Sequence, residues 1–495
     1  MNSIDGNYNY KRINDPVHGT IGLSKLEVDV INTKVFQRLR NVKQLGLVNY
    51  VFPGADFTRL SHSLGVCHVT GKLFDTLKNN NILTIDESDI RDFRLAALLH
   101  DIGHYPFSHT MEDALKLYYD KKLKTQVTQS IFKQRVDPSE NVKQKTKEKI
   151  ERPLKHDSVG REILNNDNEI VEIFEKYEID TDLICSIFTG QDAPKFANIV
   201  SSDLDADRLD YLRRSSYSVG LPYGSVDINY LISQIDIDNE ENQNLCINSK
   251  ALRTVDHFLL SRYFEYSQVI YHKTIAAFEL VLADLICYLI ETDKIIDCSP
   301  DTTVDCIRNG YWHTFDDLYV YNEIRKICSD PAAPTPIKDK AKSIIERKAP
   351  KELIKIEYIK DREEPAKKEF EEQKAQLKEL KSKLIRKFGI DDAYWIPWDN
   401  HKGLELTNLG RTKSSINIDP EKEKKTILIK NEHTKECTKI MDCNNSLMFL
   451  LSNHCLYTCR LYLLIPSDFE REQIAELKKK IADFINDEFK NQNQK

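Results

Sequence analysis

Residues 100–109 read His100-Asp-Ile-Gly-His-Tyr-Pro-Phe-Ser-His109, and this stretch decides how the chain is expected to fold. It closes a segment with helical apolar spacing, residues 92–100, and Gly103 suits a helix stop. Neighbouring helix residues point about 100° apart, so His100 and Asp101 can face one ion only where the helix ends beside it. The stretch therefore predicts a metal site at a helix terminus.

Two distant clusters extend the same pattern. They are Arg59-Leu-Ser-His62 and Asp205-Ala-Asp207, each on or beside a segment with helical spacing. A lone histidine on an apolar helix is more often structural than a ligand. The prediction therefore rests on the occurrence of all these clusters together. We predict the ligands His62, His100, Asp101 and Asp207. Imidazole with carboxylate suits a hard or borderline divalent cation such as Mn, Mg or Fe and leaves positions for water and a phosphate oxygen.

Composition narrows the class of protein. The 495 residues are enough for a large core, and 71 basic against 78 acidic residues give a net charge of −7. Nucleic acid is therefore possible but not favoured as a partner, because the chain has no global cationic field. No stretch approaches the ~20 apolar residues of a membrane span, the N-terminus is polar, and the 11 cysteines include no Cys-x-x-Cys pair. We expect a cytoplasmic protein with reduced thiols.

The pattern predicts a mainly α protein with a smaller α+β part at the C-terminus. Expected domains are a helical core at 1–295, a helical extension at 296–388 and a small α+β domain at 389–495. Residues 121–155 hold eleven basic and four acidic side chains and read as a basic insertion. A solvated loop is favoured there over a lid or a nucleic-acid contact. Expected helices cover 24–47, 61–77, 92–100, 159–177, 181–188, 197–215, 249–271, 274–292, 363–387 and 468–489, and expected strands cover 426–429, 437–441, 447–451 and 459–465.

Several further strings accompany these clusters in the same order along the chain. The set resembles the HD-domain phosphohydrolases and, within them, the deoxynucleoside triphosphate triphosphohydrolases of bacteria and the vertebrate enzyme that also has a sterile alpha motif. That motif is not seen ahead of the core here. The matching strings are Asn14-Asp-Pro-Val-His-Gly19, Phe36-Gln-Arg-Leu-Arg-Asn-Val-Lys-Gln-Leu-Gly46, Val51-Phe-Pro-Gly54, His62-Ser-Leu-Gly-Val66, His100 to His109 and Asp205-Ala-Asp-Arg-Leu-Asp-Tyr211. The resemblance implies an HD-domain helical core.

The resemblance also implies roles for individual residues. His104, Glu112 and His156 would lie around the attacked phosphorus and the leaving oxygen. Several cations beside a metal suit a triphosphate, because arginine binds phosphate oxygens in a bidentate manner. The residues implied for the triphosphate are Arg59, His109, Arg208, Tyr211 and Arg262, and those implied for the sugar are Gln44 and Leu45.

Some positions depart from the family pattern. Ser215 stands where the family has an aspartate that bonds the sugar 3′-hydroxyl, and Glu112 replaces another aspartate. Tyr271 or Ile270 matches a tyrosine that helps to exclude a 2′-hydroxyl, with Tyr271 taken as the substrate residue. Asn32 replaces an aspartate that reads guanine at the vertebrate activator site, and an amide cannot accept two donors as a carboxylate does. The other candidate regulatory residues are Lys11, Gln37 and Arg40.

We therefore expect metal-dependent hydrolysis of deoxynucleoside triphosphates to deoxynucleoside and inorganic triphosphate. The resemblance implies a homo-oligomer, dimer or tetramer, and allosteric control by an activator nucleotide. Two alternatives stay open: an HD hydrolase of a nucleoside monophosphate or signalling nucleotide, and a catalytically silent nucleotide sensor. The residues do not separate antiviral defence from maintenance of nucleotide pools.

Overall fold

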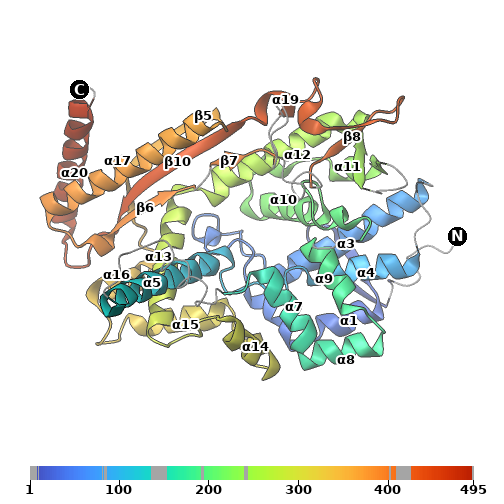
Figure 1. Cartoon of the computed structure of the whole chain (residues 1–495), viewed down its shortest axis with the longest axis horizontal. Coiled ribbons are helices and arrows are strands. Elements are labelled where there is room, and N and C mark those ends of the chain that lie inside the picture. The colour runs from blue at the N-terminus through green and yellow to red at the C-terminus, as the bar shows by residue number, and fades with distance from the viewer. Residues whose placement is uncertain are drawn as a thin grey trace. The chain divides into compact units, whose positions relative to one another are not determined.

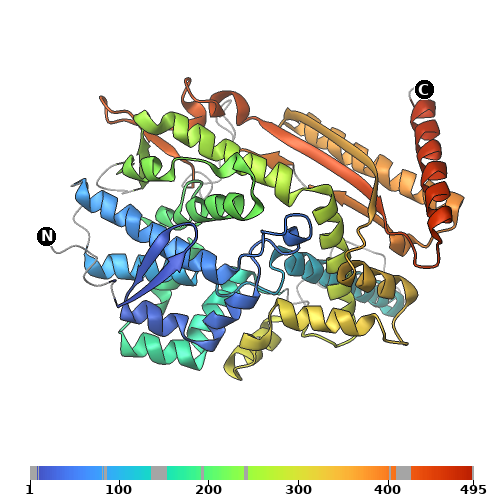
Figure 2. The same cartoon turned by 180° about the vertical axis from the view of Figure 1, so that it is seen from behind.

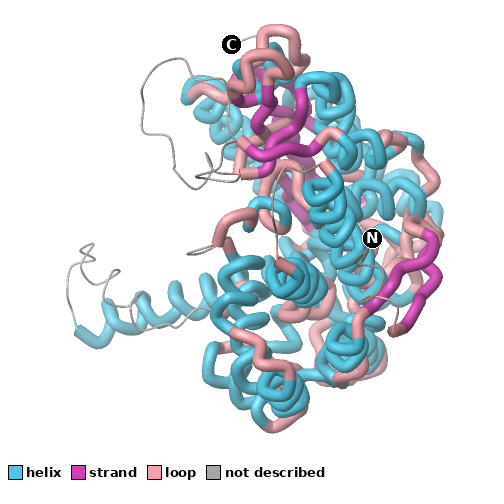
Figure 3. Tube along the Cα trace, turned by 90° about the vertical axis from the view of Figure 1, so that its right-hand side faces the viewer, coloured by secondary structure: helices cyan, strands magenta, loops and turns pink. Residues whose placement is uncertain are grey.

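A computed structural model gives the architecture of the chain. It describes residue 8, residues 10–80, residue 82 and residues 86–134, 153–190, 194–238, 244–400, 403–407 and 425–492. At 126–134, 491 and 492 it describes the backbone alone. Two compact units emerge: the first unit comprises 1–265, 286–321 and 406–452, and the second unit comprises 266–285, 322–405 and 453–495. Helices dominate both, and strands are a minority (Figure 3). The predicted mainly α class with a smaller α+β part is confirmed.

The first unit is a helical body with two small sheets (Figure 1). Its long helix α3 has fourteen buried residues and packs against α4 and α10, so these three helices form its centre. A two-stranded hairpin, β1–β2, precedes the helices, and a four-stranded sheet has the order β3-β4-β8-β9. In chain order the elements are β1 Lys11–Asp15, β2 Gly19–Leu23, α1 Lys25–Ile31, α2 Lys34–Gln37, η2 Arg38–Asn41, η3 Val48–Tyr50, α3 Arg59–Asn79, α4 Glu87–Leu99, α5 His109–Gln134, α7 His156–Asn166, α8 Asn168–Lys176, α9 Thr181–Thr189, η4 Ala197–Ile199, α10 Ala206–Val219, η5 Pro222–Gly224, α11 Ile228–Ser233, β3 Ile235–Ile237, β4 Leu245–Asn248, η6 Ser249–Ala251, α12 Leu252–Glu265, α14 Pro300–Arg308, η8 Trp312–Thr314, β8 Leu428–Lys430, β9 Cys437–Lys439, η10 Ile440–Asp442 and α19 Met448–Leu451.

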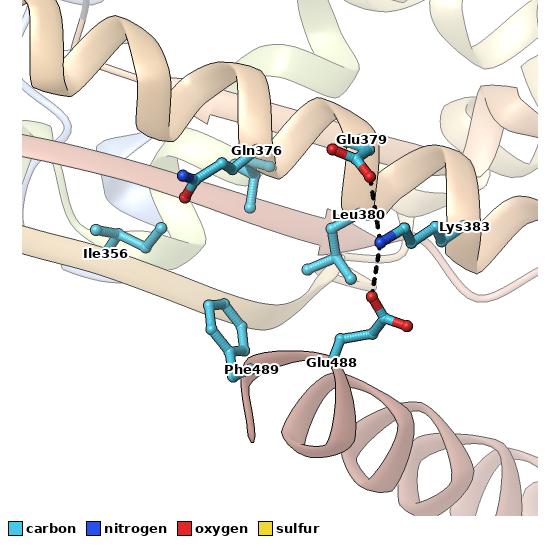
Figure 4. A pocket seen from close by; sticks show the side chains of 8 residues that line it. Ile356, Gln376, Glu379, Leu380, Lys383, Glu488 and Phe489 are labelled. Atoms are coloured by element: carbon cyan, nitrogen blue, oxygen red, sulfur yellow. Dashed lines mark hydrogen bonds and ion pairs between the residues drawn. The ribbon is translucent and has the colours of Figure 1, made fainter. Parts of the chain in front are cut away.

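The second unit holds the other sheet and the long charged helix. Strand β10 lies between β5 and β6, antiparallel to both, and helix α17 runs along this sheet (Figure 1). Lys383 of α17 contacts Glu379 and Glu488, and the second of these ion pairs joins α20 to α17 (Figure 4). The elements are η7 Tyr266–Ile270, α16 Thr335–Ile345, β5 Lys351–Asp361, α17 Glu364–Phe388, η9 Asp392–Tyr394, β6 Trp395–Asp399, β7 Leu404–Glu405, β10 His454–Leu463 and α20 Arg471–Gln492, while α13 Lys273–Glu291 and α15 Asp317–Ile327 contribute to both units.

Several expected elements are wrong in extent or type. The helix expected over 24–47 is divided, because Thr33 ends one turn and caps the next: its hydroxyl donates to the Val30 carbonyl and accepts from the Phe36 amide. The helix expected over 159–177 breaks at Asp167, whose carboxylate caps α8. Residues 447–451 were expected as a strand but lie in and beside the short helix α19. Short apolar runs do not distinguish strand from helix.

The two units do not follow contiguous sequence blocks, since residues 406–452 belong to the first and 266–285 to the second. The domain limits 1–295, 296–388 and 389–495 therefore stay predictions about the sequence. Of the basic insertion, α5 extends to Gln134, and 135–152 lie outside the described residues. Among the described helices, none is both long enough and apolar enough to cross a bilayer.

Candidate metal and catalytic site

Three helices of the first unit bring His62, His100 and Asp207 together. Their ligand-type atoms all lie within 4.8 Å of one another. His62 Nε2 is 2.9 Å from Asp207 Oδ1, and His100 Nε2 is 3.9 Å from the same oxygen. Residues 145 positions apart in the sequence thus share one point in the fold, as the sequence pattern predicts.

Helix termini set the direction of two of these groups. His100 ends α4, and its Nδ1 contacts the Ala97 carbonyl at 2.8 Å, so this nitrogen carries the proton and Nε2 presents a lone pair. Asp205 caps α10 by accepting from the Arg208 amide at 2.8 Å, which places Asp207 in the first helical turn. The helix end predicted at His100 is confirmed.

The atoms of this cluster fit a divalent cation. Within the described residues, His62 Nε2 and His100 Nε2 are buried and form no hydrogen bond, although both face the Asp207 carboxylate. A buried polar atom without a hydrogen bond is costly, and imidazole nitrogens beside a carboxylate form a ligand set for divalent metals. The residues His62, His100 and Asp207 therefore fit a divalent cation.

Asp101 lies against the same cluster but has other partners. Its Oδ1 is 3.4 Å from His100 Nε2, and its Oδ2 is 2.5 Å from Arg59 Nη1. Burial would raise the pKa of Asp101, but the Arg59 guanidinium lowers it well below the usual range. Arg59 also donates to the Ser108 hydroxyl at 2.8 Å. In this structure Arg59 thus holds Asp101 and the 101–108 turn, whereas the sequence assigns it to the triphosphate.

Asp210 contacts the cluster through His62, on the side of the imidazole away from Asp207. The sequence motifs do not identify it as a site residue. Its carboxylate accepts from His62 Nδ1 at 2.7 Å, from His18 Nε2 at 2.6 Å and from two nitrogens of Arg214 at 2.8 and 2.9 Å. Arg214 continues to Asp15 at 2.7 Å, in the hairpin visible in Figure 2. A carboxylate behind a ligating imidazole fixes its tautomer and orientation. The signal available in the sequence was the three-residue spacing from Asp207 to Asp210 on one helix face.

A second cluster, His104, Glu112 and His156, adjoins the first. The His104 and His156 rings stack with centroids 4.0 Å apart, and His104 Nε2 is 3.2 Å from Asp101 Oδ1. Glu112 accepts from His156 Nδ1 at 2.8 Å and from His109 Nδ1 at 3.0 Å. The three residues assigned to chemistry from the sequence therefore lie side by side.

The electrostatic states of this second cluster differ from ring to ring. Burial and Arg59 lower the pKa of His104 well below its usual range, so the ring is neutral. Burial would also lower the pKa of His156, but its bonds to Asp157 and Glu112 raise it to about 10. Two stacked imidazoles, one neutral and one protonated, can accept and donate protons on one side of a reacting group.

The residues expected at the triphosphate are distributed over the first unit. Arg208 is paired with Asp205 at 2.7 Å, and Arg262 Nη1 is buried and 3.5 Å from Asp203 Oδ1 without a hydrogen bond. Tyr211 lies on α10, half-buried, and the His109 side chain is 75% exposed. Of these, Arg262 presents a buried donor without a hydrogen bond, which suits an anionic ligand.

The expected sugar residues occupy different settings. Gln44 and Leu45 lie half-buried between η2 and η3, and the Gln44 Oε1 atom has no hydrogen-bond partner among the described residues. Ser215 is buried on α10 with its hydroxyl 2.8 Å from the Tyr223 hydroxyl. Tyr271 follows η7 in the second unit, where its ring packs edge-on against Trp398. Its role at the sugar stays a prediction.

The candidate regulatory residues lie near the N-terminus of the first unit. Lys11 is on β1, Asn32 ends α1, and both are exposed together with Arg40. Gln37 accepts from Arg40 Nε and donates to the Ile31 carbonyl at 2.6 Å. A nucleotide site at these residues stays a prediction.

Comparisons with known proteins agree with this geometry. The family model described as HD domain matches residues 59–212, which include both clusters. A curated protein of Methanocaldococcus jannaschii is 30% identical over 266 residues, covering 54% of this chain and 47% of the relative. The deoxynucleoside triphosphate triphosphohydrolase SAMHD1 homolog of Dictyostelium discoideum is 29% identical, covering 55% and 48%. The SAMHD1 of Homo sapiens is 50% identical over 103 residues, which are 21% and 16% of the two chains.

Solved structures support the fold over a longer range. A phosphohydrolase of Bacteroides thetaiotaomicron has a TM-score of 0.65 at 23% identity, covering 91% of this chain and 99% of the other. A hypothetical protein of Aquifex aeolicus has a TM-score of 0.64 at 24% identity, covering 96% and 99%. The chain spans about half the length of the first curated relatives that it matches.

Proposed function

We propose that the chain, whose residues 59–212 match the HD domain model, is a metal-dependent hydrolase of deoxynucleoside triphosphates. Its products would be deoxynucleoside and inorganic triphosphate. The observation that carries the proposal is that an imidazole–carboxylate cluster, in which two buried nitrogens form no hydrogen bond, lies beside a stacked histidine pair. The names of the Dictyostelium and human relatives supply the substrate class.

Each group has a role in this proposal. A divalent cation held by His62, His100 and Asp207, with Asp101 beside them, would act as a Lewis acid toward a phosphate oxygen and lower the pKa of water. In hydrolysis at the α-phosphorus, water adds, the bond from phosphorus to the 5′-oxygen breaks, and that oxygen receives a proton. His104 is neutral and suited to accept a proton, while His156 is charged and suited to give one. Glu112 positions His156 through its 2.8 Å contact.

The binding groups complete the proposal. Arg208 and Arg262 would bind the triphosphate, with Tyr211 and His109 beside it, and Gln44, Leu45 and Ser215 would contact the nucleoside. A triphosphate carries several negative charges, so cationic side chains are needed as well as a metal. The buried Nη1 of Arg262, which has no hydrogen bond, supports its part in this assignment.

The decisive experiment resolves products by anion-exchange chromatography. The full chain, stripped of metal, is incubated with each deoxynucleoside triphosphate and Mn²⁺, Mg²⁺ or Fe²⁺, with and without other nucleotides as activators. We expect equal amounts of deoxynucleoside and triphosphate. His62→Ala should abolish turnover, whereas His433→Ala, an exposed histidine outside the clusters, should not change it. Absence of both products under all conditions would remove the proposal.

A second candidate is hydrolysis of another nucleotide, favoured by Ser215 at a sugar position where the resemblance implies a carboxylate. The same chromatography would then show orthophosphate or a nucleoside monophosphate as product. Binding of nucleotide with no turnover would instead indicate a silent sensor.

Regulation and assembly are proposed from the resemblance alone. An activator nucleotide would bind at Lys11, Asn32, Gln37 and Arg40, and the chain would form a dimer or tetramer. Light scattering with and without added nucleotide measures the mass directly. Arg40→Ala should remove any nucleotide-dependent change in mass or rate while leaving hydrolysis without activator unchanged.

A further inference from the structure

Glu265, the last residue of α12, is a buried acid whose carboxyl oxygens form no hydrogen bond with the described residues, although Ser215 and Arg262 lie near it. It is 1% exposed, and neither of its carboxyl oxygens has a hydrogen-bond partner in the described part of the chain. Two equally buried acids of the same unit differ from it: Glu27 accepts from Arg94, and Asp256 accepts from Ser446 at 2.6 Å. An unsatisfied buried carboxyl group costs several kcal/mol, roughly, and such groups concentrate where a ligand completes the bonding.

The surroundings of Glu265 point toward the substrate groups. Helix α12 packs against α10 and η5, which brings Glu265 near Ser215 and Tyr223 and one turn from Arg262. The Ser215 hydroxyl is engaged with Tyr223 at 2.8 Å. Arg262 Nη1, like the Glu265 oxygens, is buried without a hydrogen bond. An acid and a guanidinium on the same stretch of helix therefore have buried atoms that form no hydrogen bond, although Arg262 is also in an ion pair with Asp203 at 3.5 Å.

The protonation state of Glu265 favours a hydroxyl group as its ligand. Burial raises its pKa to about 8, against smaller opposing effects of Ser215 and Arg262, so the group carries a proton at neutral pH. A carboxylic acid offers one O–H donor and free acceptor positions, which is the complement of an alcohol. Phosphate oxygens would instead bond to the Arg262 guanidinium. A metal cation would bind the ionised form of Glu265. It would then lie next to the Arg262 guanidinium, which is also a cation.

We infer that Glu265, together with Ser215, binds a hydroxyl group of the substrate sugar, while Arg262 binds its phosphates. The identification of the ligand rests on the proposed function, and a deoxynucleoside triphosphate has a single sugar hydroxyl, at the 3′ position. Glu265 is thus a specificity-determining residue that the sequence clusters do not contain.

The test compares a deoxynucleoside triphosphate with the 2′,3′-dideoxy analogue of the same base. In the natural chain we expect kcat/KM to be higher for the substrate with the hydroxyl. Glu265→Leu should lower that value by about 10- to 100-fold, the usual loss for a missing bond to a substrate hydroxyl, and change the dideoxy value by less than about 3-fold. Glu291→Gln, an exposed acid of the same unit, should leave both values unchanged. Parallel losses for both substrates, or no loss for either, would overturn the inference.

A relocation variant separates lost binding from damaged folding. Ser215→Asp combined with Glu265→Leu moves the carboxyl group to the neighbouring helix and should restore much of the preference for the hydroxyl-bearing substrate. Ser215→Asp alone should not exceed the natural chain, because two adjacent buried acids disfavour each other. Retention of the preference by Glu265→Leu alone, or failure of the double variant to regain any of a lost preference, would contradict the inference.

The two proposals fail in distinguishable ways. If the natural chain hydrolyses no deoxynucleoside triphosphate, the proposed function fails, and Glu265 is then tested by calorimetric binding of the same nucleotide pair. Tighter binding of the hydroxyl-bearing nucleotide that disappears in Glu265→Leu supports the inference. If the natural chain binds the two nucleotides equally tightly, the inference is wrong.

Discussion

Asp210 connects the candidate metal cluster to the rest of the fold at the scale of a single residue. It accepts from His62 on the side away from Asp207, and its other bonds reach His18 and Arg214. Asp210→Asn should weaken Mn²⁺ binding by about 10- to 100-fold, because the amide no longer orients the imidazole or raises its basicity. Titration calorimetry of the metal-free protein measures this.

Asp15→Asn is the matched control for Asp210→Asn. Asp15 also pairs with Arg214, at 2.7 Å, but does not contact His62. It should lower the free energy of unfolding with little change in metal affinity. Equal losses of metal affinity in both variants would show that Asp210 acts only through general stability.

Glu265 also makes the stability of the protein depend on pH. Its folded pKa, about 8, lies above the ordinary value of 4.5, so the folded state holds a proton that the unfolded state releases. Its contribution is complete below about pH 4.5 and is lost as pH rises through about 8. The charged groups near it are Arg262 and Asp207, and the neutral, titratable Tyr223 also faces it. Glu265→Gln should therefore reduce the fall in unfolding free energy between pH 5 and 8, measured by urea denaturation. An unchanged pH profile would contradict this.

The proximity of His62, His100 and Asp207 could be predicted because several short strings, in a fixed order along the chain, carry them together. Asp210, His18 and Glu265 could not be predicted in the same way. His18 and Asp210 are partners 192 positions apart in the sequence, and Glu265 lies near Ser215 and Tyr223, which come from other elements. Only the packing of α3 against α10, and of α10 against α12, reveals those partners.

At the scale of elements, Gly65 sets the approach of α3 to α10. A Cβ added there would lie 1.9 Å from Asp210 Oδ1 and 2.5 Å from Arg214 Nη2, both in a fully bonded network. Gly65→Ala should therefore lower the free energy of unfolding by about 1–3 kcal/mol or more, despite the better helix propensity of alanine. It should also weaken metal binding, because Asp210 must move. Denaturant unfolding and calorimetry give the two values.

Gly160 in α7 provides the comparison. A Cβ there would meet Phe188 at 3.6 Å, an ordinary contact, so Gly160→Ala should be neutral or stabilising by up to about 1 kcal/mol. If both alanine variants behave alike, the close approach at Gly65 does not limit the packing of α3 against α10.

Helices with strong periodicity could be predicted, and their interruptions could not. The expected helices at 181–188, 274–292 and 363–387 match α9, α13 and α17 closely. The segment 24–47 has the same apolar spacing, yet Thr33 diverts its hydroxyl to the backbone and begins a new turn. A local hydrogen bond of this kind competes with helix continuation and leaves the periodicity unchanged.

At the scale of the whole molecule, the chain divides into two compact units, and the candidate metal cluster lies in the first. Unfolding should therefore show two transitions. A divalent cation at about 100 times its Kd should stabilise the first unit by roughly 2.7 kcal/mol and leave the second unchanged. Leu384→Ala, which empties a fully buried site on α17, should lower the stability of the second unit by about 2–5 kcal/mol and leave the first unchanged.

Hydrogen exchange followed segment by segment can assign the two transitions. Amides of α3 and α4 report the first unit, and those of α17 and β10 report the second. Metal should slow exchange in the first pair only, since binding free energy adds to the unit that forms the site. Leu384→Ala should speed exchange in the second pair only. If either change alters all four elements equally, the units unfold together and the metal cluster depends on the stability of the entire chain.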